Sequence, residues 1–247
     1  MNSVSRSLGW QSLCVGLALA LLMSLGFWQL RRLDWKEALI ARVEARANLA
    51  PVALPPLSDW PRLAADDYDI RHVQMRGRFD FAGLALVFSQ APPRGGMEPG
   101  FLVLTPLRLE SGGVVLVNRG FVAQSKAAGG AWRSGPGGAV TITGLMRSPQ
   151  ARNSFTPADD PAKSQWYTLD PVNIAAALKL EEAAPFLVQQ DSGGESALGQ
   201  ADGLSRVFTG APEIPNNHFS YAVTWFGLAA ALAIVFAFYA RGRLAAR

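Results

Sequence analysis

The sequence predicts a membrane protein in which two transmembrane helices flank a β-rich extracytoplasmic domain, an antiparallel barrel or sandwich of the α+β class. Two apolar blocks predict the helices. Residues Phe219 to Tyr239 contain no charged side chain, and Leu13 to Leu30 form the other block. Between the blocks, short runs rich in Val, Leu and Phe alternate with Gly- and Pro-rich breaks, which is typical of strands and turns.

The first transmembrane helix is predicted at residues 10–30, after a short cytoplasmic segment at residues 1–9. About 18 apolar residues can just span a bilayer. A cleaved signal peptide is the alternative, but no small-x-small cleavage site follows the block. The pattern continues instead as a helical extension at residues 31–48, which we expect to end before Pro51.

The middle of the chain, residues 49–215, is predicted to form the β-rich domain. Prolines mark a linker between Leu49 and Asp67. A short helix is expected from Pro171 to Leu180, because Asp170 can cap it and proline is favoured in a first turn. Six strand-like runs are expected at residues 68–81, 84–90, 101–110, 114–123, 140–147 and 186–191. Short strands at such spacing are typical of an antiparallel barrel or sandwich.

The second transmembrane helix is predicted at residues 216–240, with a cytoplasmic C-terminus at residues 241–247. Its 21 uncharged residues cover roughly 31 Å at about 1.5 Å per residue, enough to cross the hydrocarbon core. Arginines at three of the last seven positions indicate that the C-terminus is cytoplasmic. Two spans then place the N-terminus inside as well and the domain outside.

Three basic residues conflict with this topology, because Arg31, Arg32 and Lys36 follow the first span on the outer side. Long domains translocate largely regardless of nearby charge, so we keep both termini inside. The unusual position of these side chains favours a functional role for them.

The net charge is concentrated around the spans. The chain has 23 Lys+Arg against 19 Asp+Glu; from Val43 to Asn217 the counts are 15 and 17, and in the two ends together they are 8 and 2. Membrane anchoring requires this pattern, and it is poor evidence for nucleic-acid binding, so no nucleic-acid partner is expected.

The reactive side chains exclude several chemistries. A single cysteine, Cys14, excludes an intrachain disulfide and a thiolate copper site. With two histidines, a three-histidine metal site is impossible. We interpret His72 as an exposed strand histidine and Asp159-Asp160 as a solvated turn. No catalytic constellation remains, so an enzyme is not expected; a membrane-anchored enzyme is kept as a third hypothesis.

Six side chains at the membrane edges of the spans form the candidate site: Trp28, Arg32, Trp35, His218, Tyr221 and Trp225. Within each half the residues are three and four apart, so they are expected to share a helix face. Asn216 or Asn217 can cap the second helix. The aromatic and basic half is either an interfacial belt or an anion-binding edge, because Arg and Trp together can hold a carboxylate.

Several short motifs follow one another along the chain: Trp28-Gln29-x-x-Arg32-x-x-Trp35-Lys36, Gly77-Arg78-Phe79-Asp80, Pro99-Gly100-Phe101, Val117-Asn118-Arg119-Gly120, Phe155-x-Pro157 and Asn216-Asn217-His218-x-x-Tyr221. In this order, between two spans, they resemble the SURF1 (Surfeit locus 1) family, the assembly factors of haem–copper cytochrome c oxidase. The resemblance covers the whole chain.

The resemblance implies an assembly factor that assists delivery or insertion of haem a into oxidase subunit I. Expected partners are cytochrome c oxidase subunit I, other oxidase assembly or haem a synthesis proteins, and membrane lipid. The alternative is an interaction chaperone that holds subunit I without binding haem.

Bacterial members of the family are proposed to bind haem a, and a neutral imidazole is a good ligand for haem iron. We therefore expect His218 to be the iron ligand at the outer membrane edge. From charge and position, we expect Arg32 and Trp35 to meet the propionates. Only nine residues precede the first predicted span, too few for a mitochondrial leader, so the expected location is the bacterial inner membrane, with the main domain periplasmic.

The topology can be tested with fusions to alkaline phosphatase, whose disulfides form only outside the cytoplasm. A fusion at Gly194 should be active and a fusion after Arg247 should be inactive. Chromogenic phosphatase activity in whole cells, corrected for fusion level by immunoblotting, is the measurement. The reverse pattern would overturn the predicted topology.

Overall fold

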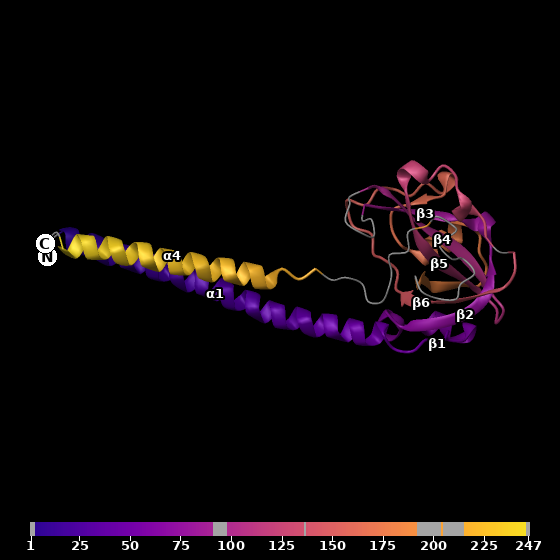
Figure 1. Ribbon diagram of the computed structural model, residues 1–247, viewed down its shortest axis with the longest axis horizontal. Coiled ribbons are helices and arrows are strands. Elements are labelled where there is room, and N and C mark those ends of the chain that lie inside the picture. Colours follow the sequence, from indigo (N-terminus) through magenta and orange to yellow (C-terminus); the bar gives the residue numbers. More distant parts are fainter. Residues whose placement is uncertain (1–2, 91–97, 136, 192–203, 205–214, 246–247) are drawn as a thin grey trace. The chain divides into compact units, whose positions relative to one another are not determined.

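The computed structural model describes residues 3–90, 98–135, 137–191, 204 and 215–245, and of residues 3–8 it describes the backbone alone. The Gly194 fusion position lies outside these residues. The chain divides into two compact units. One comprises Met1–Arg42 with Glu213–Arg247, and the other comprises Val43–Pro212. Figure 1 labels their elements.

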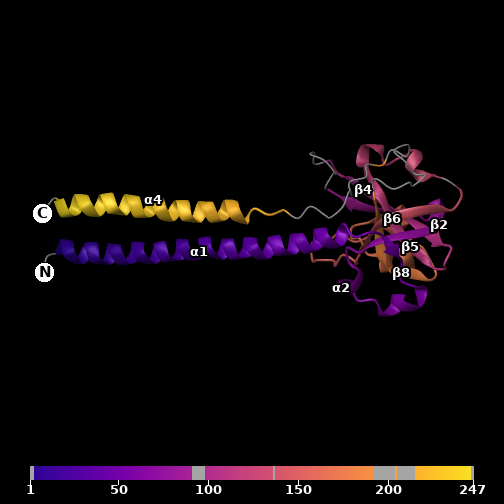
Figure 2. The same ribbon diagram turned by 60° about the horizontal axis from the view of Figure 1, so that its bottom comes forward.

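The first unit is a pair of long helices, α1 (Ser3–Ala47) and α4 (His218–Ala245). Figures 1 and 2 show them side by side and antiparallel, with both chain termini at one end of the pair. Both helices are long and apolar enough to cross a membrane. The two spans predicted from the sequence are confirmed as helices.

Both helices are longer than the predicted spans, whose own boundaries stay a prediction. Helix α1 already begins at Ser3 within the segment predicted to precede the span, and it continues without a break to Ala47. Helix α4 begins at His218 and runs beyond residue 240 to Ala245. Apolarity predicts only the segment that crosses the lipid, and at the end of α4 the residues Arg241, Arg243, Leu244 and Ala245 still favour helix.

The second unit contains an eight-stranded sheet in the order β1-β2-β6-β8-β5-β4-β3-β7. Its strands are β1 (Val52–Ala53), β2 (His72–Phe79), β3 (Ala85–Ser89), β4 (Gly100–Leu109), β5 (Val114–Ala123), β6 (Val140–Arg147), β7 (Gln165–Trp166) and β8 (Ala183–Gln190). An additional pairing of β2 with β4 closes the strands β2, β6, β8, β5 and β4 into a ring. The predicted β-rich, barrel-like domain is therefore confirmed.

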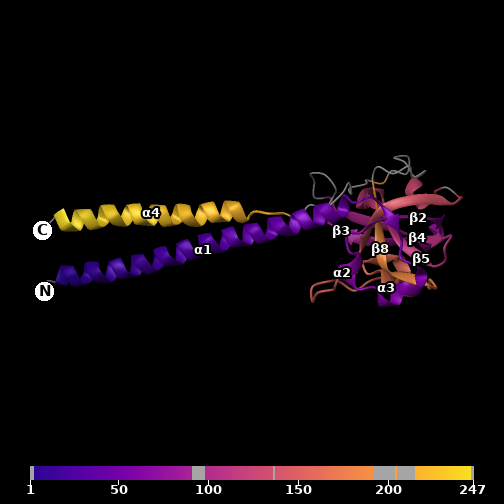
Figure 3. The same ribbon diagram turned by 90° about the horizontal axis from the view of Figure 1, so that it is seen from below.

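In the described part of the domain, two short α-helices and five 3-10 turns accompany the strands: α2 (Ala65–Tyr68), α3 (Pro171–Ala177), η1 (Leu57–Arg62), η2 (Phe81–Gly83), η3 (Gln124–Lys126), η4 (Ala131–Arg133) and η5 (Pro161–Lys163). The predicted helix at Pro171 is present, and the Asp170 carboxylate caps it by accepting from the backbone N–H groups of Val172 and Asn173. Figure 3 shows α3 beside β8.

The sheet is mixed, which differs from the antiparallel arrangement that we predicted. β1 pairs with β2, β3 with β7, and β5 with β8 in parallel, and the remaining pairs are antiparallel. A parallel pair needs a long crossover between its strands. The chain between β5 and β8 supplies one, and it includes β6, β7 and α3.

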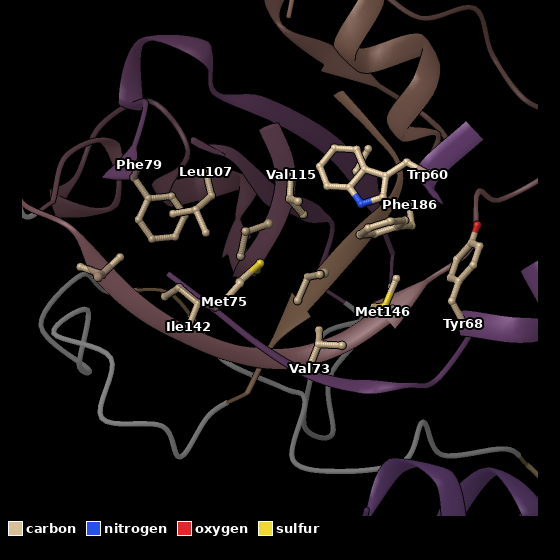
Figure 4. Packing of buried hydrophobic residues seen from close by; sticks show 14 residues of the cluster. Trp60, Tyr68, Val73, Met75, Phe79, Leu107, Val115, Ile142, Met146 and Phe186 are labelled. Carbon is tan, nitrogen blue, oxygen red and sulfur yellow. The ribbon is translucent and has the colours of Figure 1, made fainter. Parts of the chain in front are cut away.

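The interior of the ring is filled by one hydrophobic cluster, shown in Figure 4. Val73 and Met75 of β2 point inward, while Gln74 and Arg76, which alternate with them, are exposed; this is the period-two pattern of a strand with one buried face. Phe186 is fully buried at one end of the cluster, where its ring meets those of Trp60 and Tyr68. Burial of each such side chain contributes about 1.5–3 kcal/mol.

Strand β5 is buried on both faces, which explains its uninterrupted apolar run. Val115 and Val117 face the cluster inside the ring. Leu116 packs on the opposite side with Ile174 of α3 and Trp166 of β7. The central strand is thus held by two cores, and the domain needs no disulfide to close it.

Close backbone contact inside the ring makes Gly144 of β6 a sensitive position. A Cβ atom here would overlap the backbone oxygen of Gln189 in the neighbouring strand, whereas a Cβ at Gly138 would meet open space. Gly144→Ala should lower the free energy of unfolding of the domain by about 1–3 kcal/mol. Gly138→Ala should leave it unchanged. The measurement is thermal unfolding of the full chain in detergent, followed by the β signal in circular dichroism. Equal melting temperatures of the two variants would contradict the prediction.

Candidate functional site

The two long helices of the first unit pack against each other, and each contributes one stripe of more buried residues to the contact. On α4 the more buried positions His218, Ala222, Trp225 and Ala229 follow one another at four- and three-residue steps. On α1 the more buried positions recur with the same spacing, and Gly26 and Gln29 are the most buried of the span. This period of about 3.5 residues keeps one face of each helix on its partner.

A glycine brings the helices together near the middle of α1. A Cβ at Gly26 would lie 2.5 Å from Cε1 of Phe226, so only glycine admits this ring. The Phe226 ring also packs edge-on against Phe27, with ring centroids 5.4 Å apart. At the far end of the pair, the Tyr239 hydroxyl donates to Oε1 of Gln11 at 3.1 Å. These contacts fix the register of the antiparallel pair.

His218 is the first residue of α4, and its side chain is bonded to α1. Its Nδ1 lies 2.7 Å from Oε1 of Gln29. Gln29 is 8% exposed. The backbone N–H of His218 donates to the side-chain oxygen of Asn216 at 3.4 Å, and the Asn217 carbonyl accepts the first backbone hydrogen bond of the helix, from Tyr221. Within the described part of the chain, Nε2 of His218 has no hydrogen-bond partner.

The two aromatic residues predicted to accompany His218 lie in different environments. Trp225 belongs to the stripe that faces α1, and its indole Nε1 is buried without a hydrogen-bond partner among the described residues. Tyr221 is 55% exposed and lies outside that stripe. At 100° per residue the three positions lie within about 60° of one another on α4, so Tyr221 stands at the exposed edge of the face that His218 and Trp225 turn to α1.

The Trp28, Arg32 and Trp35 group is exposed on α1. The Arg32 guanidinium lies over the Trp35 ring, with Cζ 4.0 Å from the ring centroid. At 100° per residue, these three positions lie about 60–120° around α1 from Gln29. The structure thus forms the Arg–Trp pair, but on a different side of α1 from the histidine contact.

His72 is not the exposed strand histidine that we expected. Its Nδ1 lies 3.0 Å from the backbone oxygen of Leu49, and its Nε2 lies 2.6 Å from Oδ2 of Asp191. The side chain is 18% exposed. Because both ring nitrogens are engaged, neither is available to a metal. The sequence could not reveal this, since Asp191 is 119 residues away.

The Asp159-Asp160 pair has structural partners rather than acid–base ones. Asp159 accepts from Arg152 and from the backbone N–H of Tyr167. Asp160 caps the turn η5, and its hydrogen bond with the Lys163 ammonium holds the pKa of this carboxyl below its usual range. Among the described residues no group of three or more His, Cys, Asp or Glu side chains is arranged to hold a metal ion.

Gln29 is the site residue that sequence reasoning missed. It lies in the block Leu13 to Leu30, where Ser24 is the other polar residue, and a polar amide in a membrane span is costly unless it has a partner. That signal was present in the sequence. Its partner was not identifiable from local pattern, because His218 is 189 residues further along the chain.

The fold and the helix pair define a class of protein: a membrane-anchored β-barrel domain whose two flanking helices pack together and hold a histidine. The family model described as "SURF1 family" matches residues 16–230. The chain therefore belongs to the SURF1 family.

Three curated relatives illustrate the match. Surfeit locus protein 1 of Xenopus tropicalis is 32% identical over 93% of this chain and 75% of its own length. Surfeit locus protein 1 of Mus musculus is 32% identical over 84% of this chain and 68% of its own length. A SURF1-like protein of Drosophila melanogaster is 33% identical over 91% of this chain and 74% of its own length.

Proposed function

We propose that this chain is an assembly factor for haem–copper cytochrome c oxidase that assists delivery of haem a to subunit I. We place it in the bacterial inner membrane with the β-domain on the periplasmic side. Membership of the SURF1 family supports the assembly role. The arginines at 241 and 243, after the apolar part of α4, support the orientation.

The proposal that haem a is the molecule delivered rests on the hydrogen bonding of the His218 ring. One ring nitrogen is bonded to Gln29, and the other has no partner within the described residues. An imidazole held in this way presents one nitrogen lone pair, which is what haem iron takes from a protein ligand. His72, with both nitrogens engaged, does not present one.

Two neighbouring side chains fit an apolar macrocycle with polar substituents. Trp225 offers a buried indole N–H that lacks an acceptor among the described residues, and indole N–H groups usually find a partner when buried. Tyr221, one turn into α4, presents an exposed ring with a hydroxyl. These residues would hold the porphyrin, while His218 would bind its iron.

Arg32 and Trp35 are assigned a separate role in this proposal. The guanidinium lies against the indole ring and remains exposed, so its N–H groups are available to an anion. The propionates of haem a are one such anion, and a lipid or partner carboxylate or phosphate at the membrane edge is another. The Arg32 variants described below distinguish binding of such an anion from a role as an interfacial belt of aromatic and basic residues.

Changing His218 tests the cargo assignment. His218→Ala should insert normally, since Ala favours helix and the Asn216 side chain can still accept from the backbone N–H of residue 218. The variant should lose most of the haem absorbance and impair oxidase maturation. The measurement is the Soret band of the full chain purified from cells that make haem a, together with oxidase activity in their membranes.

His72→Gln is the matched control, because the glutamine amide can still donate to one of the two acceptors of the ring, Leu49 or Asp191, and the residue lies outside the proposed site. It should keep both haem and oxidase activity. Retained haem in the His218 variant with loss in the His72 variant would reverse the assignment. Absence of haem from the wild-type chain as well would favour a chaperone that holds subunit I without haem.

Changing Arg32 tests the basic edge. Arg32→Ala should lower oxidase activity or haem retention partially, because the loss of one charged hydrogen bond costs about 1.5–3 kcal/mol. Arg31→Ala is the control: Arg31 is the adjacent exposed arginine and contacts no aromatic ring among the described residues. Wild-type oxidase activity of Arg32→Ala at equal membrane levels would identify the group as an interfacial belt.

A further inference from the structure

We infer that Gln29 is a positioning residue for His218: its hydrogen bond to Nδ1 holds the imidazole in the tautomer whose Nε2 lone pair is free. The inference rests on the proposed haem role of His218 and adds a residue from the other helix to it. It follows from the atoms that meet between α1 and α4.

The tautomer follows from the nature of the acceptor. A neutral imidazole carries one N–H and one lone pair, and the amide oxygen of Gln29 can only accept a hydrogen bond. At 2.7 Å from this oxygen, Nδ1 must therefore carry the proton. Nε2 is then the unprotonated nitrogen. A neutral imidazole in water prefers the opposite arrangement, with the proton on Nε2, so the contact reverses the intrinsic preference.

The buried location of Gln29 strongly favours formation of its hydrogen bond to His218. The amide is 8% exposed and lies in an apolar span, so loss of its partner would leave a buried polar group unsatisfied. Such a partner also fixes the ring orientation, as carboxylates and carbonyls do for metal-binding histidines elsewhere. The ring is thus aligned before any ligand arrives.

The helix pair does not depend on this bond for its register. Phe226 packs on Gly26 and Phe27, and Gln11 bonds to Tyr239 at the far end of the pair. Gln11 and Gln29 are the same residue type on the same helix, about 27 Å apart along its axis. Gln11 is consequently an internal control, because it also bonds to α4 but lies far from His218.

Three variants of the full chain separate positioning from helix pairing. Gln29→Met keeps the length of the side chain and removes the acceptor. Gln29→Glu keeps an acceptor oxygen. Gln11→Met removes the equivalent interhelical bond at the other end.

The first measurement uses haem-free protein in detergent at pH 8, with histidine labelled by ¹⁵N. The nitrogen chemical shifts report which ring nitrogen is protonated, and His72→Gln assigns the two histidines. His218 should be protonated mainly on Nδ1 in the wild type, Gln29→Glu and Gln11→Met. In Gln29→Met it should change to mainly Nε2.

The second measurement is titration of the same proteins with haem a, followed at the Soret band. The dissociation constant should rise about 10–100-fold in Gln29→Met, the effect expected when the hydrogen-bond partner of a ligating histidine is lost. It should stay within about threefold of wild type in Gln29→Glu and in Gln11→Met.

Two results would overturn the inference. One is a Gln29→Met variant that keeps the Nδ1 proton and wild-type haem affinity. The other is a Gln11→Met variant as impaired as Gln29→Met, which would assign the effect to helix pairing. A wild-type chain that does not bind haem a overturns the proposed cargo, and the nitrogen shifts still decide whether Gln29 sets the tautomer.

Discussion

The hydrogen bond between Gln29 and His218 is the polar constraint at the end of the helix pair where α4 begins. Two apolar helices in lipid gain little from burying apolar surface against each other, so close packing and interhelical hydrogen bonds decide how they associate. Here Gly26 provides the close packing, and Gln29 provides a polar contact three residues further along α1. Together they bring the first side chain of α4 onto α1, so the start of α4 and the orientation of its histidine are set by the same contacts.

The domain between the helices is stabilised in a different way. The pairing of β2 with β4 closes the ring and leaves neither strand as a long unpaired edge. Apolar side chains fill the interior, and a second cluster covers the outer face of β5. The lone cysteine, Cys14, lies in α1 and takes no part in this. Closure and two-sided burial therefore stabilise the domain without the disulfides on which many smaller domains depend.

The sequence pattern predicted those strands that are determined by residues close together in the chain. The expected runs at 114–123 and 140–147 coincide with β5 and β6, because turn residues bound apolar runs of strand length. Tyr68 was expected in a strand but ends α2, and the two-residue strands β1 and β7 are too short to show a period. The parallel pairings and the partners of His72 and Gln29 depend on contacts across many residues, which no local pattern encodes. For the site, the sequence therefore predicted residue types near a membrane edge, while the structure supplied the pairing.

The helix pairing separates the histidine contact from the exposed Arg–Trp group, which we had combined into one candidate site from the sequence. Helix α1 presents Gln29 to α4 on one face, and it exposes Trp28, Arg32 and Trp35 on a face about 60–120° away. A ligand bound through the histidine is oriented by neutral hydrogen bonding in a water-poor contact, which depends little on salt. A ligand or lipid bound through the arginine is held by an exposed charge, which salt screens. The two faces should therefore respond differently to ionic strength, and one helix can hold a neutral imidazole in a fixed orientation while its neighbouring face attracts anions.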